Sequence, residues 1–589
     1  MKSCRLTAAM VVITIGSVAA FFAGCFMSTE PSPRRIERFT REWKFHPGDL
    51  QGAEEPGFVD SGWRQLDLPH DWSIEGAFSA ENPATPGGGA LPGGIGWYRK
   101  HFSLARADSG KIIFIDFDGV YRNSEVWING RYLGKRPYGY SSFRYELTPW
   151  LHYGERPNTL AVRVDNSRQP NSRWYSGSGI YRNVWLTVTG RVYVDHWGTF
   201  ITTPEVSAQQ ASVALQTRVR NAAEAPQKVT IETAIFGPDG AKKTAVSRKI
   251  LIQPGAVETV SQKGMVKQPE LWSVDQPALY RAVTQIKAAG AELDRYETPF
   301  GIRTIAFDGE KGFSLNGAAM KILGVCNHHD LGCLGAAINE RALERQLELL
   351  KGMGCNAIRT SHNPPAPELL DLCDRMGFLV MDEAFDMWKL GKNPDDYHLD
   401  WNEWHRRDLE DLILRDRNHP SVMMWSIGNE ILEQWDDSGL EMTRELAEIV
   451  RALDTTRPVM ATRPDKCHIS HVVADTETWE QKMAQVLEDM PEVVRYVKNH
   501  NLGFFIPYTF NGEERNYIPD FIACIEDGRG ADDLLNLIVE VSGEKKKDKA
   551  AKTATARELW VPAVNNHGGF GRWAFIEIAD PWNAESLIR

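Results

Sequence analysis

Three short apolar runs decide the fold of this chain: Cys355-Asn-Ala-Ile-Arg359, Phe378-Leu-Val-Met381 and Ser421-Val-Met-Met-Trp425. Each run has the length of a buried strand, and a stretch with helical spacing separates each from the next. Strands that alternate with helices must pair in parallel, because the chain returns to the same edge of the sheet after each helix. Repeated this often, the alternation predicts a (β/α)8 barrel.

The helices between these runs can be located from their apolar spacing. Asn339 to Gly352 places Leu343, Leu347 and Leu350 on one face, and Asn339 is a suitable N-cap because its side-chain oxygen can accept a hydrogen bond from a free N–H of the first turn. The same reasoning predicts three further elements: a buried strand over Ala319–Val325 and helices over Pro367–Met376 and Trp401–Asp416.

The chain before this region is rich in β-strand signals. Within residues 36–190, Lys111–Gly119 and Ser124–Gly130 alternate apolar and polar residues and end in Asp-Gly and Asn-Gly, the strongest hairpin signals. This pattern predicts a β-sandwich of jelly-roll type. Residues 191–299 repeat it with fewer aromatic residues, as in Lys228–Phe236, which predicts a smaller immunoglobulin-like sandwich.

The composition is that of a globular protein with several domains. A length of 589 residues predicts about four domains, and 42% apolar with 25% charged residues is ordinary for proteins with buried cores. The net charge of −11 argues against a protein that coats nucleic acid, so no nucleic-acid partner is expected. The eight cysteines include no CxxC pair and no zinc spacing, so neither a metal site nor a disulfide framework is indicated.

The first 25 residues have the pattern of an export signal. Lys2 and Arg5 precede an apolar run from Leu6 to Phe22, which is too short for a stable spanning helix. The small residues before Cys25 resemble a bacterial lipobox, in which the cysteine becomes the lipidated first residue; an ordinary signal peptide is the alternative. We therefore expect an exported protein, in the periplasm or attached to the outer membrane of a bacterium.

Polar residues follow four consecutive strands of the predicted barrel, at the ends where barrel enzymes carry their catalytic groups. A glutamate at such a strand end is a candidate general acid, because partial burial raises the pKa of a carboxyl toward the working pH. In strand order, the residues are Asn327, His328, His329 and Asp330; Arg359, Ser361, His362 and Asn363; Asp382, Glu383 and Asp386; Asn429 and Glu430.

Several motifs together resemble glycoside hydrolase family 2. The longest is Ser172-Arg-Trp-Tyr-Ser-Gly-Ser-Gly-Ile-Tyr-Arg-Asn-Val184, which is similar to the stretch that closes the family's sugar-binding domain. Five others occur in the family's order between about residue 36 and residue 460: Leu68-Pro-His-Asp-Trp72, Gly96-Trp-Tyr-Arg99, Ala357-Ile-Arg-Thr-Ser-His-Asn-Pro364, Met381-Asp-Glu-Ala-Phe-Asp386 and Trp425-Ser-Ile-Gly-Asn-Glu430. The resemblance implies a jelly-roll, an immunoglobulin-like domain and a barrel that act on β-linked glycosides, as β-galactosidases, β-glucuronidases and β-mannosidases do.

The resemblance also implies roles for individual residues. Glu430 takes the place of the acid/base, and Asn429 that of the neighbour that hydrogen-bonds the 2-hydroxyl of the sugar. The other expected subsite residues are His328, Arg359 and His362, with Trp388 and Trp425 as walls. The large β-galactosidases of the family bind magnesium beside the acid/base, but Met387 and Lys389 occupy those ligand positions here, so no metal or other cofactor is expected.

The family pattern then stops. Members retain configuration, which requires a second carboxylate as nucleophile about 5–5.5 Å from the acid/base. Arg457-Pro-Val-Met460 looks like the start of a fifth strand, but strands six to eight and a glutamate in the nucleophile's context are not recognisable after it. The sequence thus predicts a truncated barrel over residues 300–461 and impaired hydrolysis.

Residues 462–589 resemble the C-terminal end of the restriction subunit of type III restriction enzymes. The similarity rests on Thr478–Lys482, Tyr517–Phe521, Leu537–Val541 and Trp560–Asn565, and implies an α/β nuclease fold of the PD-(D/E)xK kind. Asp520 and Glu540 would then hold magnesium, although Ser542 stands where the pattern has lysine. We interpret the combination as a fusion that replaced the end of the barrel.

Three functions follow in order of support. The first is an exported retaining β-glycosidase, β-galactosidase-like and impaired, whose sugar is left open by the sequence. The second is a carbohydrate-binding protein that does not cleave. The third, a magnesium-dependent nuclease, is disfavoured by the net charge and the export signal.

Overall fold

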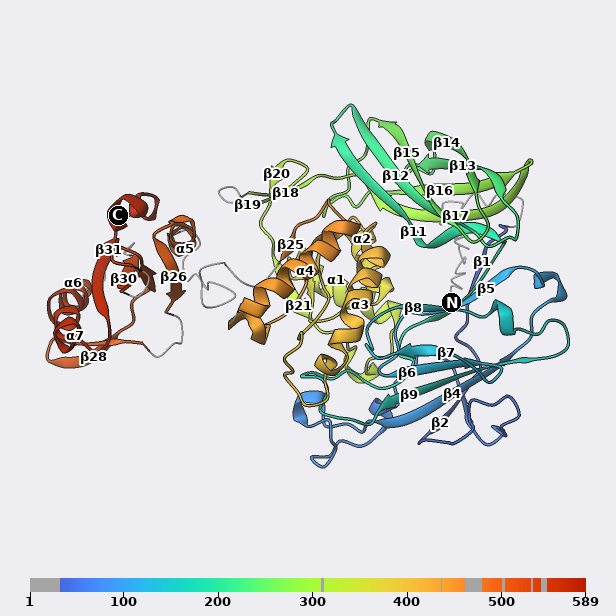
Figure 1. Ribbon diagram of the computed structural model, residues 1–589, viewed down its shortest axis with the longest axis horizontal. Helices are drawn as coiled ribbons and strands as arrows, with labels where there is room; N and C mark the ends of the chain where they lie inside the picture. Colours follow the sequence, from blue (N-terminus) through green and yellow to red (C-terminus); the bar gives the residue numbers. More distant parts are fainter. Residues whose placement is uncertain are drawn as a thin grey trace, which may run out of the picture.

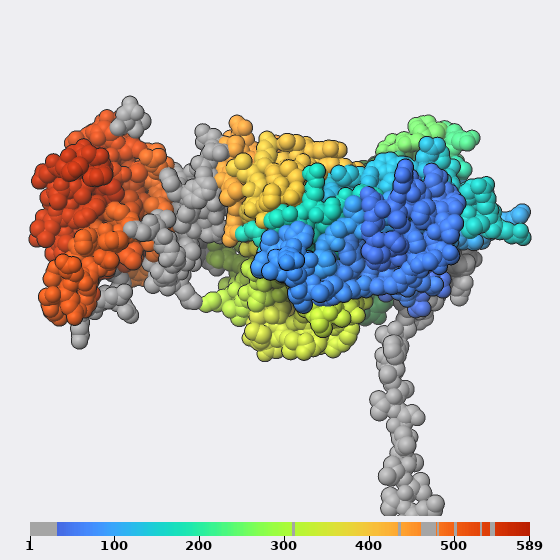
Figure 2. All heavy atoms as spheres, turned by 90° about the horizontal axis from the view of Figure 1, so that it is seen from below, coloured from blue at the N-terminus to red at the C-terminus, as the bar shows by residue number. Residues whose placement is uncertain are grey.

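The computed structural model describes residues 32–308, 312–435, 437–460, 479–499, 504–530, 533–541 and 548–589. The predicted signal peptide and Cys25 lie outside these residues. Two β-sandwiches pack against an α/β part, and a C-terminal unit lies at the end of the molecule away from the sandwiches (Figures 1 and 2). Among the described helices, none is both long and apolar enough to cross a membrane.

The first sandwich consists of two antiparallel sheets. One has the order β1 (Arg35–Arg38), β10 (Val184–Thr189), β5 (Ile112–Phe117) and β8 (Phe143–Glu146). The other has the order β3 (Arg64–Leu66), β2 (Trp43–Pro47), β4 (Gly94–Phe102), β9 (Asn158–Asn166), β6 (Ser124–Ile128) and β7 (Arg131–Arg136). Trp43, Tyr98 and Phe117 are fully buried in the core between the sheets, as the alternating pattern requires.

Only one of the two predicted hairpins of this sandwich forms. Asn129 and Gly130 have φ values of 52° and 78° and join β6 to β7, as expected for a two-residue hairpin turn. Asp118-Gly119 instead leads from β5 into the other sheet. Gly119 is required for a different reason: a Cβ at this position would lie 2.7 Å from Cδ of Arg182.

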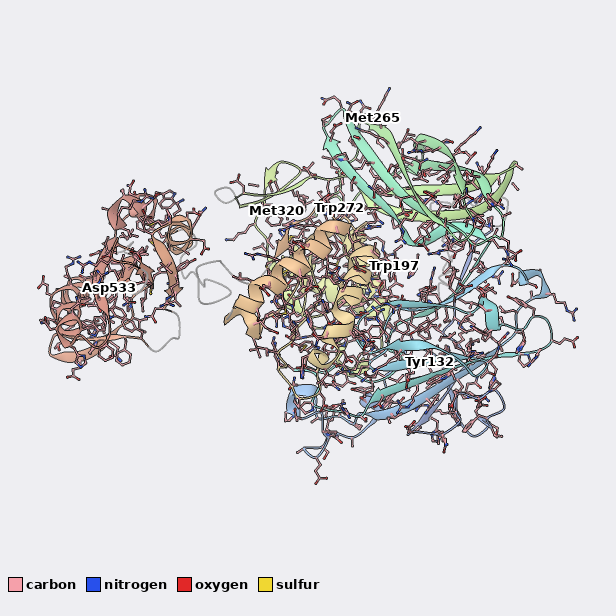
Figure 3. The ribbon with its side chains drawn as sticks, in the orientation of Figure 1. Tyr132, Trp197, Met265, Trp272, Met320 and Asp533 are labelled. Carbon is pink, nitrogen blue, oxygen red and sulfur yellow. The ribbon has the colours of Figure 1, made fainter. Side chains whose placement is uncertain are left out.

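The second sandwich is the predicted immunoglobulin-like domain. One sheet has the order β11 (Val192–Val206), β12 (Gln210–Asn221) and β15 (Val257–Lys267). The other has the order β14 (Lys242–Ile252), β13 (Gln227–Phe236), β16 (Leu279–Ala288) and β17 (Ala291–Gly301). A small antiparallel sheet follows, made of β18 (Ile305–Asp308), β19 (Gly312–Leu315) and β20 (Ala318–Ala319). Trp272, labelled in Figure 3, is fully buried between this domain and the α/β part and donates to the carbonyl of Asp374 at 2.9 Å.

The α/β part has five parallel strands in sequence order. They are β21 (Gly324–Asn327), β22 (Ala357–Thr360), β23 (Leu379–Glu383), β24 (Val422–Ser426) and β25 (Val459–Met460), joined by α1 (Glu340–Gly352), α2 (Pro367–Met376), α3 (Trp401–Asp416) and α4 (Asp437–Leu453). The predicted helices are confirmed, and the Asn339 side chain accepts from the N–H of Ala342 at 3.0 Å. Within the described residues the sheet is not closed, so it is the first part of a barrel.

The first barrel strand departs from its prediction. The buried strand expected over Ala319–Val325 is β21, which begins at Gly324 and is largely exposed. The reason is its position: β21 pairs with β22 alone, so one of its edges and much of its surface have no neighbouring strand.

The C-terminal unit is a separate α/β layer, as predicted in general terms. Its mixed sheet has the order β26 (Val493–Lys498), β29 (Phe521–Ile525), β30 (Leu535–Val541) and β31 (Arg572–Ile578), beside a hairpin of β27 (Ile506–Phe510) and β28 (Glu513–Tyr517). The helices are α5 (Trp479–Asp489), α6 (Lys549–Ala554), α7 (Val561–His567) and α8 (Ala584–Ile588). None of its described strands pairs with β25.

Buried arginines join the first sandwich to the carboxyl ends of the barrel strands. Arg182 donates to the carbonyl oxygens of Pro364 and Pro365 at 2.8 and 3.0 Å, in the loop after β22. Arg136, at the end of β7, pairs with the fully buried Asp408 of α3. These contacts fix the sandwich over the end of the sheet where catalytic groups are expected.

Candidate active site

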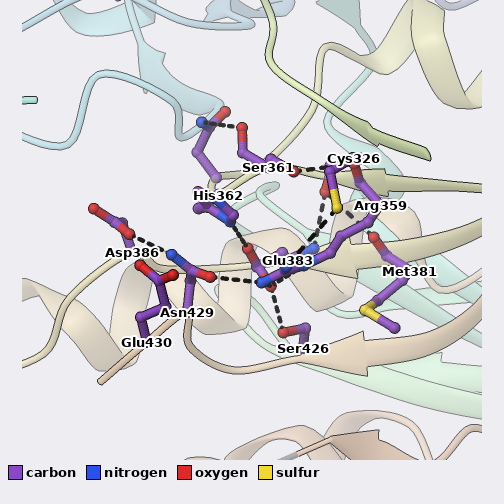
Figure 4. A network of polar contacts seen from close by, with 12 residues as sticks. Cys326, Arg359, Ser361, His362, Met381, Glu383, Asp386, Ser426, Asn429 and Glu430 are labelled. Atoms are coloured by element: carbon purple, nitrogen blue, oxygen red, sulfur yellow. Dashed lines mark hydrogen bonds and ion pairs between the residues drawn. The ribbon is translucent and has the colours of Figure 1, made fainter. Parts of the chain in front are cut away.

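The ends of β22, β23 and β24 bring together most of the predicted residues. Arg359 lies near the end of β22, Glu383 ends β23, and Asn429 and Glu430 follow β24 (Figure 4). Parallel pairing places these ends at one edge of the sheet, and this is why residues far apart in the sequence meet here.

Glu383 is the centre of the network. Its carboxylate is fully buried and accepts from Arg359 Nε at 2.9 Å, Arg359 Nη2 at 2.7 Å and Ser426 Oγ at 2.7 Å, while His362 Nδ1 lies 2.6 Å from its other oxygen. These partners use both oxygens of the carboxylate. Glu383 therefore orients Arg359 and His362, and the sequence reasoning, which noted its position, did not assign it this role.

Asn429 connects this group to the acid/base candidate. Arg359 Nη2 donates to Asn429 Oδ1 at 2.8 Å, and Asn429 Nδ2 donates to Asp386 Oδ1 at 2.7 Å. The amide orientation is thus fixed on both sides. The next residue, Glu430, has a φ of 44°, in the left-handed region that residues other than glycine rarely occupy. Such backbone strain costs on the order of 1 kcal/mol and is concentrated at functional sites.

Arg173 of the first sandwich reaches into this site, which the sequence reasoning missed. Its Nη2 lies 2.7 Å from Asp386 Oδ1 and 3.0 Å from Glu430 Oε2, and its Nε lies 3.1 Å from Asp386 Oδ2. Lys392 Nζ, 2.9 Å from Asp386 Oδ1, completes the cluster. The signal for Arg173 is its place inside the motif 172–184, which by itself indicates only the end of the sugar-binding domain.

The charge state of Glu430 differs from the sequence expectation. Partial burial raises its pKa, but the hydrogen bond and the positive charge of Arg173, together with Lys392, outweigh this effect and leave the pKa below its ordinary value. The side chain of Glu430 is also 66% exposed, so it is not a desolvated carboxyl. In this structure Glu430 is a carboxylate rather than a protonated general acid.

Two predicted histidines, together with Trp174, which the sequence analysis did not predict as a site residue, form a second cluster. The rings of His328 and His362 are 5.6 Å apart, and Trp174 of the first sandwich lies 4.9 Å from His328 and 5.5 Å from His362. Burial, followed by the charge of His362, lowers the pKa of His328. The neutral ring therefore offers one donor and one acceptor to a sugar hydroxyl.

Trp388 and Trp425 occupy the core, which does not match their predicted place as subsite walls. They are 2% and 1% exposed, and their Nε1 atoms donate to the carbonyl of Ile427 at 2.9 Å and to Asp454 Oδ2 at 2.9 Å. Neither ring has a face open to a ligand in this structure. Aromatic residues beside a strand end fill cores as readily as they line subsites, and the sequence did not separate the two.

Asp520 and Glu540 lie together in the C-terminal unit. Phe521 pairs with Val539 in the antiparallel register of β29 and β30, and Asp520 Oδ2 accepts from the N–H of Val541 at 2.7 Å. Glu540 accepts from Tyr517 Oη at 2.7 Å and Lys552 Nζ at 2.5 Å. Within the described part of the chain, no group of three or more His, Cys, Asp or Glu is arranged to hold a metal ion. Ser542 lies outside the described residues.

Comparison with known proteins identifies the class. Three family models match in succession: "Glycosyl hydrolases family 2, sugar binding domain" over residues 82–190, "Glycosyl hydrolases family 2" over 192–303 and "Glycosyl hydrolases family 2, TIM barrel domain" over 308–511. The chain belongs to glycoside hydrolase family 2. The barrel match extends about 50 residues past the boundary at residue 461 that the sequence reasoning drew.

Relatives and solved structures agree with this assignment. Beta-galactosidase BoGH2A of Bacteroides ovatus is 54% identical over 468 residues, which cover 74% of this chain and 55% of that protein. A beta-glucuronidase of Formosa agariphila is 29% identical over 446 residues, covering 72% of this chain and 44% of its own. The chain thus spans about half the length of the curated relatives it matches.

Two solved structures resemble this one. A glycosyl hydrolase family 2 member from Bacteroides cellulosilyticus has a TM-score of 0.71 and 43% identity, with coverage of 72% of this chain and 55% of that chain. Bacteroides uniformis beta-glucuronidase 2, described as covalently bound to cyclophellitol-6-carboxylate aziridine, has a TM-score of 0.64 and 30% identity, with coverage of 72% and 52%.

Proposed function

We propose that this chain carries the sugar subsite and the acid/base of an exported retaining β-glycosidase, β-galactosidase-like in specificity. The observation that supports this most directly is the network that joins Arg359, Asn429 and Glu430 through Glu383 and Asp386 at the strand ends. The β-galactosidase name of a relative that is 54% identical supports galactose as the sugar.

In this mechanism Glu430 donates a proton to the glycosidic oxygen and later takes one from water. Arg359 and Asn429 hold the sugar hydroxyls. Glu383 fixes the position of Arg359 and Asp386 that of Asn429, so both side chains are already oriented when the sugar binds. The covalent adduct of the B. uniformis β-glucuronidase is consistent with a covalent intermediate in the family.

The nucleophile is not among the described residues of this site. Glu383 is the other carboxylate of the network, but it is fully buried and both its oxygens are occupied by Arg359, Ser426 and His362. An anomeric carbon could not reach it without loss of these bonds. We therefore expect hydrolysis by this chain to be many orders of magnitude slower than by an intact relative.

The test supplies a nucleophile from solution. An aryl β-galactoside is incubated with the purified chain, with and without sodium azide. Azide attacks the anomeric carbon and the aryl alcohol leaves. Glu430 is needed in this reaction only to protonate the leaving oxygen, and only when the leaving group is poor. We expect the unmodified chain to form the α-galactosyl azide. With a galactoside whose leaving group is poor, the Glu430→Gln variant should not form this product. Rapid turnover without azide would show that a nucleophile is present after all.

Aryl β-glucuronides and β-mannosides are tested in the same way to identify the sugar. Preference for either over the galactoside would replace the galactosidase proposal and leave the glycosidase proposal in place.

A carbohydrate-binding protein without cleavage is the second candidate. It is favoured by the same observation: the sugar-contact network is intact, and no nucleophile lies beside it among the described residues. It predicts that galactose binds by calorimetry, that affinity survives Glu430→Ala, and that azide produces no galactosyl azide. Binding and azide-dependent product formation therefore separate the two candidates.

The nuclease alternative rests on the neighbouring positions of Asp520 and Glu540 across β29 and β30. Lys552 Nζ lies 2.5 Å from Glu540, and Lys498 Nζ lies 3.7 Å from Asp520, so a lysine ammonium group lies beside each carboxylate. Cleavage of duplex DNA in magnesium that is abolished by Asp520→Ala would establish this function. A PCR product across codons 440–480 of the source genome would establish whether the proposed fusion exists.

Export with lipid attached to Cys25 is a proposal from residues 2–25 alone. Labelling with radioactive palmitate in a bacterial host tests it, with Cys25→Ala as the control. If the unmodified chain and the Cys25→Ala variant are labelled equally, or if neither is labelled, lipid is not attached at Cys25. Export of such a protein would then be explained by an ordinary signal peptide.

A further inference from the structure

A cavity of about 420 Å³ lies where the immunoglobulin-like domain meets the barrel part. Its walls come from residues 200–204 of β11, residues 300–305, the segment 417–420 before β24 and the segment 455–457 before β25. These segments lie at the amino-terminal ends of the barrel strands, whereas Glu430 follows the carboxyl end of β24. Five residues of strand span roughly 17 Å, so this cavity is distinct from the candidate active site.

The lining of the cavity is strongly basic. It includes Arg303, Arg417 and Arg457 and several hydroxyl groups, and none of its lining residues is Asp or Glu. The hydroxyl groups belong to Thr202, Thr203, Thr304, Thr455 and Thr456. A surface with this composition offers many hydrogen-bond donors and a positive potential, which is the requirement for binding an anion.

Among the described residues, the acceptors of Arg303 are neutral carbonyl oxygens. Its Nε donates to the carbonyl of Pro420 at 2.5 Å and its Nη2 to the carbonyl of Val422 at 2.6 Å. Burial and then the charge of Arg457 lower the pKa of Arg303 to about 9, and Asp374 and Asp454 offset this only in part. The guanidinium is thus held in place without a carboxylate partner.

Arg417 is in the same situation. It is 7% exposed, stacks over Phe200 at 4.5 Å and donates to the carbonyls of Leu453 at 3.1 Å and Trp197 at 3.5 Å. Its buried Nε has no hydrogen-bond partner among the described residues. Burial lowers its pKa to about 10, although the charge of Asp454 acts in the opposite direction.

Arg457 is the only one of the three with its own counter-charge. Its Nη1 lies 2.8 Å from Asp454 Oδ2, and the same carboxylate accepts from Trp425 Nε1 at 2.9 Å and Thr456 Oγ1 at 2.7 Å. Asp454 is therefore already committed to Arg457. In the part of the chain that the structure describes, the guanidinium charges of Arg303 and Arg417 have no carboxylate paired to them beside the cavity.

We propose that this cavity binds a tetrahedral oxyanion, phosphate or sulfate, either free or esterified to a sugar. A guanidinium charge without a counter-charge is unfavourable when it is buried, as in Arg417, or partly buried, as in Arg303, so a bound oxyanion would stabilise both arginines. The planar guanidinium matches two oxygens of such an anion at once, and the threonine hydroxyls supply further donors. The volume is within the range of sites for small organic ligands, so a sugar ester fits as well as a free ion.

The test is titration calorimetry on the full chain with sodium sulfate, sodium phosphate and galactose 6-sulfate. Sodium chloride at the same ionic strength is the blank, and excess galactose keeps the sulfated sugar out of the candidate active site. We expect saturable binding of one oxyanion per chain. Binding of the ester about tenfold tighter than that of free sulfate identifies a sugar ester as the ligand; equal affinity identifies the free ion.

Gln216→Glu provides the decisive variant. Gln216 is an exposed residue of β12 that lines the cavity, so the substitution adds a negative charge to the wall and leaves the arginines and their carbonyl contacts in place. We expect it to weaken oxyanion binding at least about tenfold. Gln253→Glu, on an exposed turn of the same domain away from the cavity, is the matched control and should bind as the unmodified chain does.

Arg417→Lys keeps the charge but removes the planar fork, and should weaken binding about fivefold. If this variant fails to fold, Gln216→Glu still decides the question. Absence of saturable binding by all three oxyanions, or equal binding by Gln216→Glu and Gln253→Glu, would overturn the proposal.

Discussion

Arg173 Nη2 lies 3.0 Å from Glu430 Oε2, so a residue of the first sandwich holds the acid/base candidate of the barrel part. The same guanidinium makes two further bonds to Asp386. A general acid must carry a proton, yet this pairing favours the carboxylate of Glu430. The structure therefore presents the site with its acid/base in the ionised form, and a ligand that draws Arg173 away from Glu430 would favour protonation.

The first prediction is that Arg173→Gln raises the pKa of Glu430. In the unmodified chain the pKa lies below the ordinary value of 4.5 because Arg173 stabilises the carboxylate. Loss of this charge shifts the balance toward burial, which favours the protonated form. At a fixed pH near 5 the protonated fraction of Glu430 should increase. Infrared titration of the carboxyl band, with the spectrum of Glu430→Gln subtracted, measures it.

Arg168→Gln is the matched control for this titration. Arg168 lies in the same loop and is exposed, and its side chain has no bond to Asp386 or Glu430. A shift of equal size in both variants would mean that Arg173 acts only through the overall charge of the loop, which contradicts the direct contact.

The second prediction concerns Glu383→Gln. The substitution leaves Arg359 beside a neutral amide in a buried position, and removal of one partner from such a pair costs about 3 kcal/mol. We expect lower stability and loss of galactose binding, since Arg359 and His362 are no longer oriented. Chemical denaturation and calorimetry measure the two effects. Glu403→Gln, on the exposed face of α3, should change neither.

Local sequence signals predicted the fold wherever an element's neighbours lie close in the chain. The helix after Asn339 and the hairpin at Asn129-Gly130 form as expected because a cap and a two-residue turn act within a few residues. The Asp118-Gly119 hairpin and the buried strand at 319–325 failed for the opposite reason. Their outcome depends on which strand lies beside them, and a local pattern does not contain that information.

The site divides in the same way. Arg359, His362, Asn429 and Glu430 could be placed together because parallel strands end at one edge of the sheet. Arg173 could not, since it lies 213 residues before Asp386 and reaches the site only through the packing of two domains. Trp425 is the opposite case, a residue that the sequence places in the site and the structure places in the core. Its position at a strand end suggests a subsite wall, but its indole Nε1 donates to Asp454 in the core.

The third prediction tests the contact between the first sandwich and the barrel part. Arg136 is 1% exposed and pairs with Asp408 and Asp411 at 2.6 Å each, while Asp408 also accepts from Ser141 and Tyr397. Arg136→Met leaves the fully buried Asp408 without its cation, at a cost of about 3–5 kcal/mol. We expect a lower unfolding temperature by scanning calorimetry.

Arg131→Met is the control for this variant, because Arg131 lies on the same strand but is exposed and only stacks on Trp150. Retention of the unfolding temperature by Arg136→Met would mean that the interface does not depend on the ion pair. Because the first sandwich brings Arg173 to Asp386 and Glu430, a loosened interface should also weaken galactose binding relative to the control.

The fourth prediction is a loss of stability at alkaline pH that depends on His419. Burial alone would lower its pKa, but the charge and hydrogen bond of Asp374, whose Oδ2 lies 2.6 Å from His419 Nδ1, raise it to about 9. In the unfolded chain the pKa is near 6.5. Because the folded value is the higher one, the contribution is fully present below pH 6.5 and is lost as the pH rises through 9.

The contribution is about 3 kcal/mol, so the free energy of unfolding of the barrel part should decline between pH 6.5 and 9. Hydrogen exchange of the amides at Ser421 and Val422, which adjoin the pair, reports it locally; the Ser421 N–H donates to Asp374 Oδ1 at 3.0 Å. His419→Gln should remove this decline, whereas His567→Gln, at an exposed position of the C-terminal unit, should retain it. An equal decline in both variants would show that other groups, and not the His419–Asp374 pair, set the alkaline limit.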